Sequence, residues 1–146
     1  MNLQEIADRF EIEQLLNRYC NVVDDQDWKS FDGLFTDDAE LDYSAFGGPV
    51  CGVRDLKAFL SPIVASMQNT QHTISTMVLG IDGDQAQART AGLVMMVSDT
   101  FEGGSHVAFS GLWYRDVLIR TADGWRIRKR VQEFGWLHNM PSMGES

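Results

Sequence analysis

Apolar residues recur at helical spacing over the first part of the chain. Between Leu3 and Val23 they lie three, four or six positions apart with charged residues between them, which predicts one long amphipathic helix. Asn2 can cap the start of this helix together with Glu5, three residues later. The chain therefore begins with a helix that has one face to bury.

Two further helices are expected before the pattern changes. A short helix follows Asp27, whose side chain can cap it, and ends at Thr36-Asp37-Asp38. Its inward residues would be Trp28, Phe31, Leu34 and Phe35. A longer helix is predicted from Arg54 to Met67, where six apolar residues form a single stripe. Pro62 within it predicts either a kink or a second start capped by Ser61.

The rest of the chain has the pattern of β-strands. A short strand is expected over Ala39–Tyr43, before a turn at Gly47-Gly48-Pro49. Four long strands are then predicted at Gln71–Ile81, Gln85–Thr100, His106–Arg120 and Trp125–Leu137. Turns that contain glycine separate them, so consecutive strands would pair as antiparallel hairpins.

Three helices followed by a meander of strands predict an α+β fold. A strongly curved antiparallel sheet would wrap around the long N-terminal helix as a cone, with residues 1–146 forming one domain. Small residues on the strands are compatible with an internal pocket that opens at one end. These residues are Ala86, Ala88, Ala91, Gly92, Ala108 and Gly111. Residues 138–146 would be either a mobile lid over this pocket or a frayed end.

Composition narrows the classes of partner. The 146 residues carry a formal net charge of −9, and 44% of them are hydrophobic, which excludes a disordered chain. Phosphate backbones and anionic lipids repel so acidic a protein, so neither nucleic acid nor a membrane is expected as a partner. Cys20 and Cys51 are too few for a disulfide framework, and no signal peptide is visible. Reduced thiols and a cytoplasmic location are therefore expected.

His72 and Asp24 are the residues best suited to acid–base chemistry. His72 begins the first long strand, and its same-face neighbours Ile74 and Val78 are apolar, so its ring is expected to face inward. Asp24 ends the first helix beside Asp25, and only one of these two side chains can point inward. An inward Asp24 would fix the tautomer of the imidazole, whose other nitrogen could then take a proton from a substrate.

Other polar residues leave alternatives open. Tyr19 and Tyr43 are either core aromatics or hydrogen-bond donors that stabilise an enolate. Arg126, Arg128 and Arg130 alternate with their neighbours and share one face, which is more often the solvated one. A β-bulge would be needed to turn one of them inward.

The remaining histidines, His106 and His138, lack the local spacing of metal ligands. Glycine-rich phosphate loops and a GxSxG sequence are also absent from the chain. We therefore expect neither a metal nor a cofactor.

Five segments taken together resemble a known family. They are Tyr19–Trp28, Leu41–Ser44, Thr70–His72, Leu112–Tyr114 and Asp123–Trp125. In order and spacing they resemble the SnoaL-like branch of the nuclear-transport-factor-2-like superfamily, from about Ile6 to Trp136. Within this branch the chain looks most similar to scytalone dehydratase, bile-acid 7α-dehydratase and hexachlorocyclohexane dehydrochlorinase.

The resemblance implies a cone whose pocket holds a catalytic Asp–His dyad, which Asp24 and His72 would form. It also implies that Tyr19 matches a phenol of the bile-acid enzyme and that Tyr43 matches a phenol of both dehydratases. Arg130 would correspond to a pocket arginine of the dehydrochlorinase. The resemblance thus implies that Tyr19, Tyr43 and Arg130 contact the substrate.

Two departures from scytalone dehydratase change the expected pocket. The second catalytic histidine of scytalone dehydratase has no counterpart in Leu93–Val97, the segment that includes Met96. The position of that enzyme's pocket asparagine falls near Ser110 in this sequence. Met96 and Ser110 are therefore expected to contact the substrate in a more apolar pocket. A polyhydroxylated naphthalene is then not the expected substrate.

These observations lead to one functional hypothesis and two alternatives. The leading hypothesis is a cofactor-independent lyase or isomerase, similar to a dehydratase, that removes a proton from an apolar cyclic or aromatic small molecule. The alternatives are a noncatalytic small-molecule binding protein and an assembly subunit like the small subunit of ring-hydroxylating dioxygenases.

A homodimer or homotrimer is also expected. Four large apolar residues of the predicted strands cannot all lie inside a curved sheet. They are Met77, Leu79, Trp113 and Leu118.

Overall fold

The computed structural model describes residues 1–141 of the chain, which form three α-helices and six strands. The helices are α1 (Leu3–Asp24), α2 (Trp28–Phe31) and α3 (Val53–Ala65). The strands are β1 (Phe35–Asp42), β2 (Val50–Cys51), β3 (Asn69–Asp82), β4 (Gln85–Asp99), β5 (Ser105–Thr121) and β6 (Gly124–His138). Short 3-10 turns at Asp32–Leu34 and Ser44–Phe46 flank β1.

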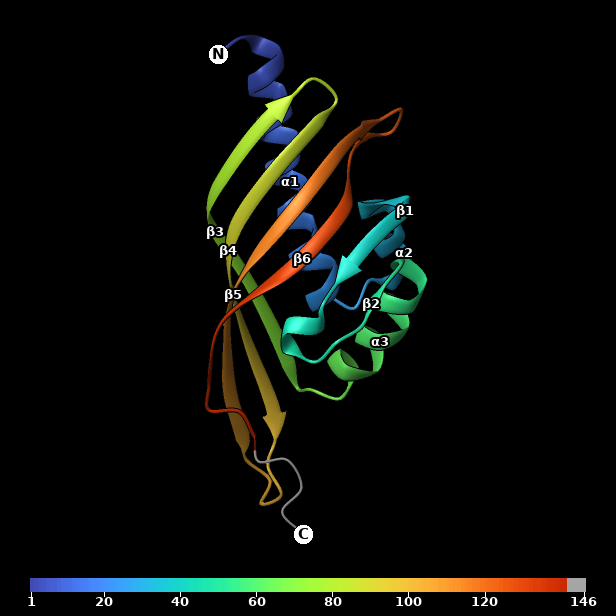
Figure 1. Cartoon of the computed structure of the whole chain (residues 1–146). Coiled ribbons are helices and arrows are strands. Elements are labelled where there is room, and N and C mark those ends of the chain that lie inside the picture. Colours follow the sequence, from blue (N-terminus) through green and yellow to red (C-terminus); the bar gives the residue numbers. More distant parts are fainter. Residues whose placement is uncertain (142–146) are drawn as a thin grey trace.

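The six strands form one curved, open sheet in the order β2-β1-β6-β5-β4-β3 (Figure 1). β3 to β6 pair antiparallel as a meander, as the sequence predicts. β1 pairs parallel to β6, however, so the expectation of a wholly antiparallel sheet is wrong and the sheet is mixed. β1 enters the sheet from the helical half of the chain, and no hairpin joins it to β6 to impose an antiparallel pairing.

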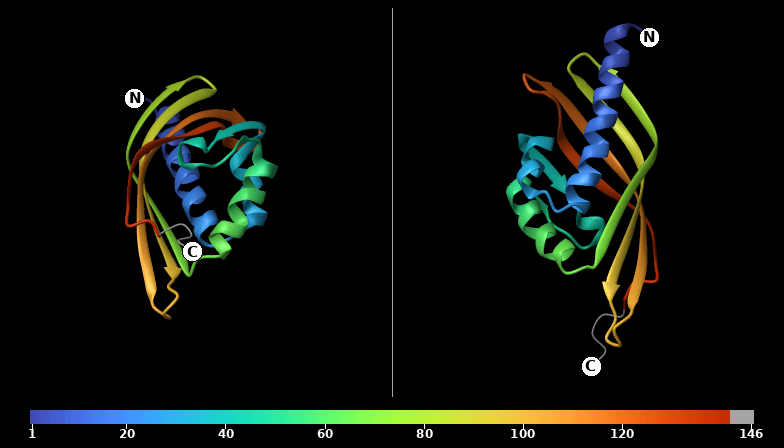
Figure 2. Two further views of the ribbon diagram at one scale, coloured as in Figure 1. Left: turned by 60° about the horizontal axis from the view of Figure 1, so that its bottom comes forward. Right: turned by 180° about the vertical axis from the view of Figure 1, so that it is seen from behind.

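Helix α1 lies against the concave face of the sheet, while α2 and α3 cover the end where β1 and β2 lie (Figures 1 and 2). The predicted N-cap is confirmed, because the side chain of Asn2 accepts a hydrogen bond from the backbone N–H of Glu5. Ile12, Leu15 and Leu16 are fully buried on its inner face. Burial of each such side chain contributes about 1.5–3 kcal/mol to folding. The predicted α+β cone is confirmed.

Element boundaries differ from the sequence-based expectation in two places. Phe35 begins β1 instead of ending the short helix, and Thr36-Asp37-Asp38 lies within the strand because Phe35 pairs with Ile127 of β6. Helix α3 runs through Pro62 to Ala65 with Gly52 at its N-cap, so there is no second start at Ser61. Pro62 removes one helical hydrogen bond but does not end the helix.

As expected, the four large apolar residues of the strands are not all inside: Leu79 and Leu118 are buried in the core, whereas Met77 and Trp113 are only partly buried. One packing expectation is wrong. Gly92 and Gly111 make room for neighbouring aromatic rings instead of a pocket, because a Cβ added there would meet Tyr114 and Trp136. No helix within residues 1–141 is long and apolar enough to cross a membrane.

Candidate active site

A cavity of about 510 Å³ lies between helix α3, the Ser44–Phe46 turn and the strands β3 to β6. Its walls are mostly apolar and include Phe46, Phe59, Leu60, Ile63, Met67, Val94, Met96, Leu112, Leu137 and Met140. Four lining residues carry polar side chains: Tyr43, His72, Ser110 and Gln132. An apolar chamber with a few polar groups is typical of a small-molecule site.

The register of the sheet places one row of these residues at the same level. His72 pairs with Val94 of β4, Val94 pairs with Ser110 of β5, and Ser110 pairs with Leu137 of β6. Residues paired directly across strands point to the same face of a sheet. His72 and Ser110 therefore face the same chamber with one strand between them.

Asp24 and His72 form a close pair. The Nδ1 atom of His72 lies 2.5 Å from Oδ1 of Asp24. The backbone N–H of His72 donates to Oδ2 of Asp24 at 2.7 Å, and the hydroxyl of Thr70 donates to Oδ1 at 2.9 Å. Asp25, the next residue, is exposed. The carboxylate is thus fixed at the start of β3, and Nε2 is the ring nitrogen left for a ligand.

The environment of Asp24 favours its ionised form. Burial alone would raise the pKa of this carboxyl group, but the hydrogen bonds and charge of His72, with the hydroxyl of Thr70, outweigh it and lower the pKa below its usual value. An anionic Asp24 orients the ring through Nδ1 and stabilises the imidazolium that forms when Nε2 takes a proton.

Tyr19 and Tyr43 form a second close pair. Their hydroxyl oxygens lie 2.5 Å apart, and both side chains are buried. The ring of Tyr19 also meets the ring of His72 edge-on, with centroids 6.3 Å apart. Burial raises the pKa of both phenols, so they are protonated and can donate hydrogen bonds. Tyr43 lines the cavity, whereas Tyr19 lies behind it.

Arg130 is not on the cavity wall. Val117 pairs with Lys129 and Leu118 pairs with Ile127, so Arg128 is an extra residue at a β-bulge. The bulge reverses the alternation and turns Arg130 into the core, where it is 1% exposed.

In the core Arg130 forms a stack with buried side chains. It donates two hydrogen bonds to Asp116, at 2.7 and 2.9 Å. Its guanidinium carbon lies 4.4 Å from the ring centroid of Tyr19 and 4.1 Å from that of Tyr114. The expected contact of Arg130 with a substrate is therefore replaced by a contact with Tyr19.

The structure brings together most of the residues singled out from the sequence. His72, Tyr43, Ser110 and Met96 line the cavity, and Asp24 holds the ring of His72. Tyr19 and Arg130 form the layer behind Tyr43 and do not line the cavity.

Sequence reasoning missed Thr70, Gln132 and Asp116. Thr70 could have been found by alternation, since it lies two positions from His72. Alternation would have placed Gln132 on the solvated face with Arg130, so it could not have been found in this way. Nothing local marked Asp116 as the partner of Arg130, because that contact depends on the bulge.

The end of the described chain lies at the cavity. Met140 contributes to the wall. The preceding residue, Asn139, donates from its side chain to the carbonyl of Val107 at 2.7 Å, and its own carbonyl lies 2.6 Å from Nε2 of His106. Of the segment 138–146 expected to be a lid or a frayed end, residues 142–146 lie outside the described residues. Within residues 1–141, no three His, Cys, Asp or Glu side chains are arranged to hold a metal ion.

Comparisons with known proteins agree with this architecture. The family model for the SnoaL-like domain matches residues 4–131. An uncharacterised protein of Mycobacterium tuberculosis is 38% identical over 133 residues, covering 90% of this chain and 88% of the relative.

Two solved structures share the fold. A scytalone dehydratase-like protein of Novosphingobium aromaticivorans superposes with a TM-score of 0.83 at 19% identity, covering 98% of this chain and 94% of that one. A type 2 hexachlorocyclohexane dehydrochlorinase superposes with a TM-score of 0.79 at 19% identity, covering 100% and 97%. At these identities the likeness concerns the fold.

Proposed function

We propose that this chain, which belongs to the SnoaL-like family and has a cavity beside its Asp24–His72 pair, is a cofactor-independent lyase or isomerase. The reaction is dehydratase-like and begins with removal of a proton from an apolar cyclic or aromatic molecule. The observation that carries this proposal is the contact of 2.5 Å between Asp24 and Nδ1 of a histidine that lines an apolar cavity.

His72 is the general base in this mechanism. Asp24 occupies Nδ1, so Nε2 takes a proton from the carbon next to a substrate carbonyl. The electron pair of the broken C–H bond forms a carbon–carbon double bond, and a hydroxyl group on the next carbon leaves. His72 returns its proton to that hydroxyl, which departs as water, and no oxidant or reductant is consumed. An isomerase would return the proton to another carbon instead.

Tyr43 polarises the substrate oxygen. It is the cavity-lining phenol, and its hydroxyl contacts that of Tyr19, which stacks against Arg130. The positive charge of Arg130 lowers the pKa of both phenols and so opposes the larger effect of burial. A phenol beside this charge is a stronger hydrogen-bond donor to the enolate oxygen that develops in the transition state.

The walls favour a flat hydrocarbon skeleton with few oxygens. Phe46, Phe59 and Leu60 come from the turn and α3, and Val94 and Met96 come from β4. Such surfaces gain free energy from apolar contact and offer no partner to charged groups. Ser110 and Gln132 supply the remaining polar contacts.

The proposal is tested with a β-hydroxy derivative of α-tetralone, which loses water to give α-naphthol. Product is followed by fluorescence and by the loss of water in mass spectra. Wild-type protein is expected to accelerate the reaction, and His72→Gln to lower the rate by about 10²-fold or more. His138→Gln is the matched control, because His138 is exposed and absent from the cavity wall, and it should retain the wild-type rate.

A noncatalytic binding protein would give another result in the same experiment. The tetralone would then bind to the wild-type protein and to His72→Gln with similar affinity, and neither would form product. That outcome would refute the lyase proposal.

We also propose that the protein forms a homodimer or homotrimer. Val107 and Trp136 are 38% and 47% exposed although both are large and apolar. Exposed apolar side chains of this kind favour association. Light scattering coupled to size-exclusion chromatography tests this directly, and a monomer at micromolar concentration would contradict it.

A further inference from the structure

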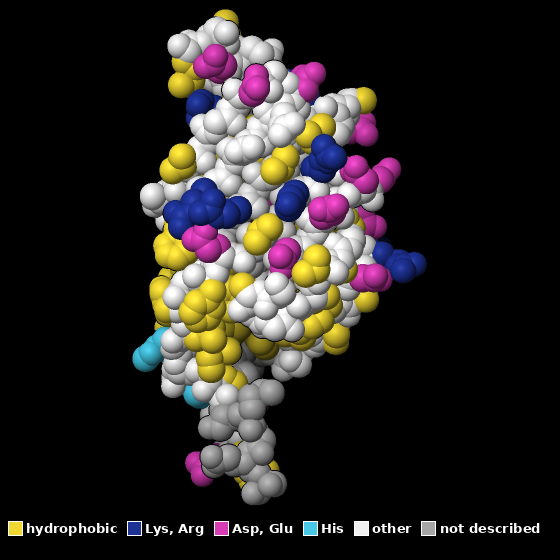
Figure 3. Space-filling view, viewed as in Figure 1, with side chains coloured by type: hydrophobic (Ala, Val, Ile, Leu, Met, Phe, Trp, Pro, Cys, Tyr) yellow, Lys and Arg dark blue, Asp and Glu magenta, His cyan; other side chains and the backbone are white. Residues whose placement is uncertain are grey.

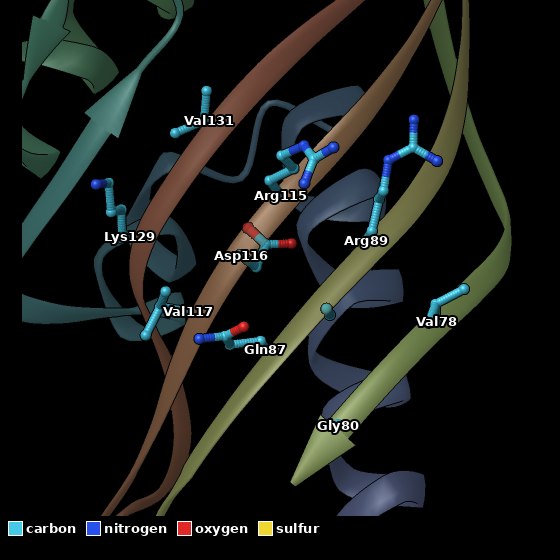
Figure 4. A pocket seen from close by; sticks show the side chains of 10 residues that line it. Val78, Gly80, Gln87, Arg89, Arg115, Asp116, Val117, Lys129 and Val131 are labelled. Carbon is cyan, nitrogen blue, oxygen red and sulfur yellow. The ribbon is translucent and has the colours of Figure 1, made fainter.

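A second hollow, of about 500 Å³, lies on the outer face of the sheet, away from α1 (Figure 4). Two rows of side chains cross it. Gln87, Val117 and Lys129 pair across β4, β5 and β6, and Arg89, Arg115 and Val131 form the next row. We call this surface the outer groove; its lining residues also include Val78 and Gly80 of β3. The outer groove is separated from the catalytic cavity by the sheet itself.

The outer groove is positively charged in an acidic protein. Arg89 and Arg115 are direct cross-strand partners, an arrangement that repels unless an anion lies between them. Glu133 supplies one carboxylate, which contacts Nη2 of Arg89 at 2.6 Å and Nε of Arg115 at 2.5 Å. Lys129 adds a third cation. In Figure 3 Lys and Arg side chains lie over the middle of the sheet on this face, with Asp and Glu side chains beside them.

Asp116 is the acidic residue that lines the outer groove, and it is already paired. Asp116 is buried, and both of its oxygens accept hydrogen bonds from Arg130. Arg89 and Arg115 share the single carboxylate of Glu133, which leaves one positive charge in excess at this pair. Lys129 lies directly across from Glu40 of β1 and its charge also acts on Asp42. The chain as a whole carries a net charge of −9, so this local excess is unlike the rest of the protein.

The guanidinium groups are held in place before any ligand binds. Arg89 stacks on the ring of Trp113, with its guanidinium carbon 4.5 Å from the ring centroid, and is tied to Glu133. Its Nε atom is buried and has no hydrogen-bond partner. Arg115 is tied to Glu133 through Nε only, so both of its terminal nitrogens are available. A guanidinium group with free terminal nitrogens matches the oxygens of a phosphate group.

We propose that the outer groove binds a doubly charged oxyanion carried on a small apolar group, such as an aryl phosphate monoester. A phosphate monoester carries a charge close to −2 at neutral pH, and its oxygens can accept hydrogen bonds from the free terminal nitrogens of Arg115 and from Lys129. Arg89, Arg115 and Lys129 contact the phosphate oxygens. Val117 and Val131 lie in the same two rows and contact the apolar group.

The test uses phenyl phosphate as the probe, with binding measured by calorimetry at low ionic strength and located by NMR chemical shifts. Arg115→Gln and Lys129→Gln are each expected to weaken binding about tenfold or more, because each removes a charged contact. Arg128→Gln is the matched control. Arg128 is exposed, neighbours Lys129 on β6 and does not line the outer groove, so this variant should bind like wild type.

Glu133→Gln gives the opposite prediction and separates this site from general surface attraction. Removal of the competing carboxylate should tighten the binding of phenyl phosphate. Added salt should weaken binding to the wild-type protein, because exposed charges are screened.

Several results would overturn the proposal. Phenol, which lacks the phosphate, should not bind the outer groove, and equal binding of phenol and phenyl phosphate would contradict it. Chemical-shift changes confined to His72 and Ser110 would place the ligand in the catalytic cavity instead. If the protein binds no phenyl phosphate but dissociates into monomers in the Arg115→Gln variant, the outer groove is an interface between two copies of the chain.

Discussion

Replacing Asp116 by Asn should be among the most damaging conservative changes in the molecule. Arg130 and Asp116 are 1% and 3% exposed, and two hydrogen bonds join them. The variant keeps the shape of the side chain but removes its negative charge. The guanidinium of Arg130 would then be a buried cation without a counter-charge. It would keep its contacts with the rings of Tyr19 and Tyr114 and at most one hydrogen bond to the amide oxygen of the new side chain.

The expected loss follows from that unpaired charge. Breaking a buried ion pair by removing one partner costs about 3–5 kcal/mol of folding free energy. For a chain of this length each kcal/mol corresponds to roughly 2–4 °C in melting temperature. Asp116→Asn should therefore lower the Tm by about 10 °C, and a urea titration should give the same loss of unfolding free energy.

Two further variants identify the cause. Arg128→Gln removes an exposed arginine whose Nε atom lies 3.8 Å from Asp38, and it should change the stability by less than about 1 kcal/mol. Asp116→Leu combined with Arg130→Met removes both charges and should recover most of the lost stability. If Asp116→Asn is as stable as the wild type, or if the double variant is less stable than the single one, the buried pair does not have the role assigned to it.

Other predictions concern stability and reactivity. The hydrogen bond from Arg120 lowers the pKa of Asp8 in the folded state, so the stabilisation lost in Asp8→Asn should be full at neutral pH. It should begin to decline as the pH falls below about 4 and disappear only when the pH drops through the lowered pKa of the folded state; urea titrations at several pH values measure it. Gly135→Ala should cost about 1–3 kcal/mol, because its Cβ would lie 2.5 Å from a backbone carbonyl oxygen, whereas Gly80→Ala meets no atom within 4 Å and should fold normally in the same titration. Burial raises the pKa of the Cys20 thiol to about 11, so iodoacetamide at neutral pH should leave it unmodified in mass spectra.

The main elements could be predicted because their patterns are local. The spacing of apolar residues between Leu3 and Val23 can be satisfied by one amphipathic helix, and glycine-containing turns divide the β-rich half into a meander. β2 was not predicted because a strand of two residues, Val50–Cys51, has no alternation to detect. The parallel pairing of β1 with β6 depends on packing between distant parts of the chain.

The candidate site likewise contains residues whose orientation follows from a local pattern and residues whose orientation depends on distant contacts. His72 faces the cavity as predicted, but of the two neighbours used for that prediction only Ile74 is partly buried against the core. Val78 is exposed on the outer face, because β3 has a register shift between Ser75 and Val78. Asp24 is within reach because α1 ends beside the start of β3. The orientation of Arg130 could not be read from alternation, since the single extra residue Arg128 reverses it. Gly111 was read as space for a ligand, but the indole of Trp136 fills that space. A small residue such as Gly111 indicates that a large group packs against it, but only the structure shows that this group is a side chain of the protein and not a ligand.

The most direct test of the central claim is the rate at which the protein exchanges the acidic protons of β-tetralone for deuterium. This reaction needs a base next to a bound ketone but no leaving group, so it isolates the proton transfer assigned to His72 and Asp24. NMR in deuterated water gives the rate after subtraction of the uncatalysed exchange. We expect wild-type protein to exceed His72→Gln by about 10²-fold or more, with Asp24→Asn also impaired. Equal rates for the wild type and His72→Gln would contradict the account.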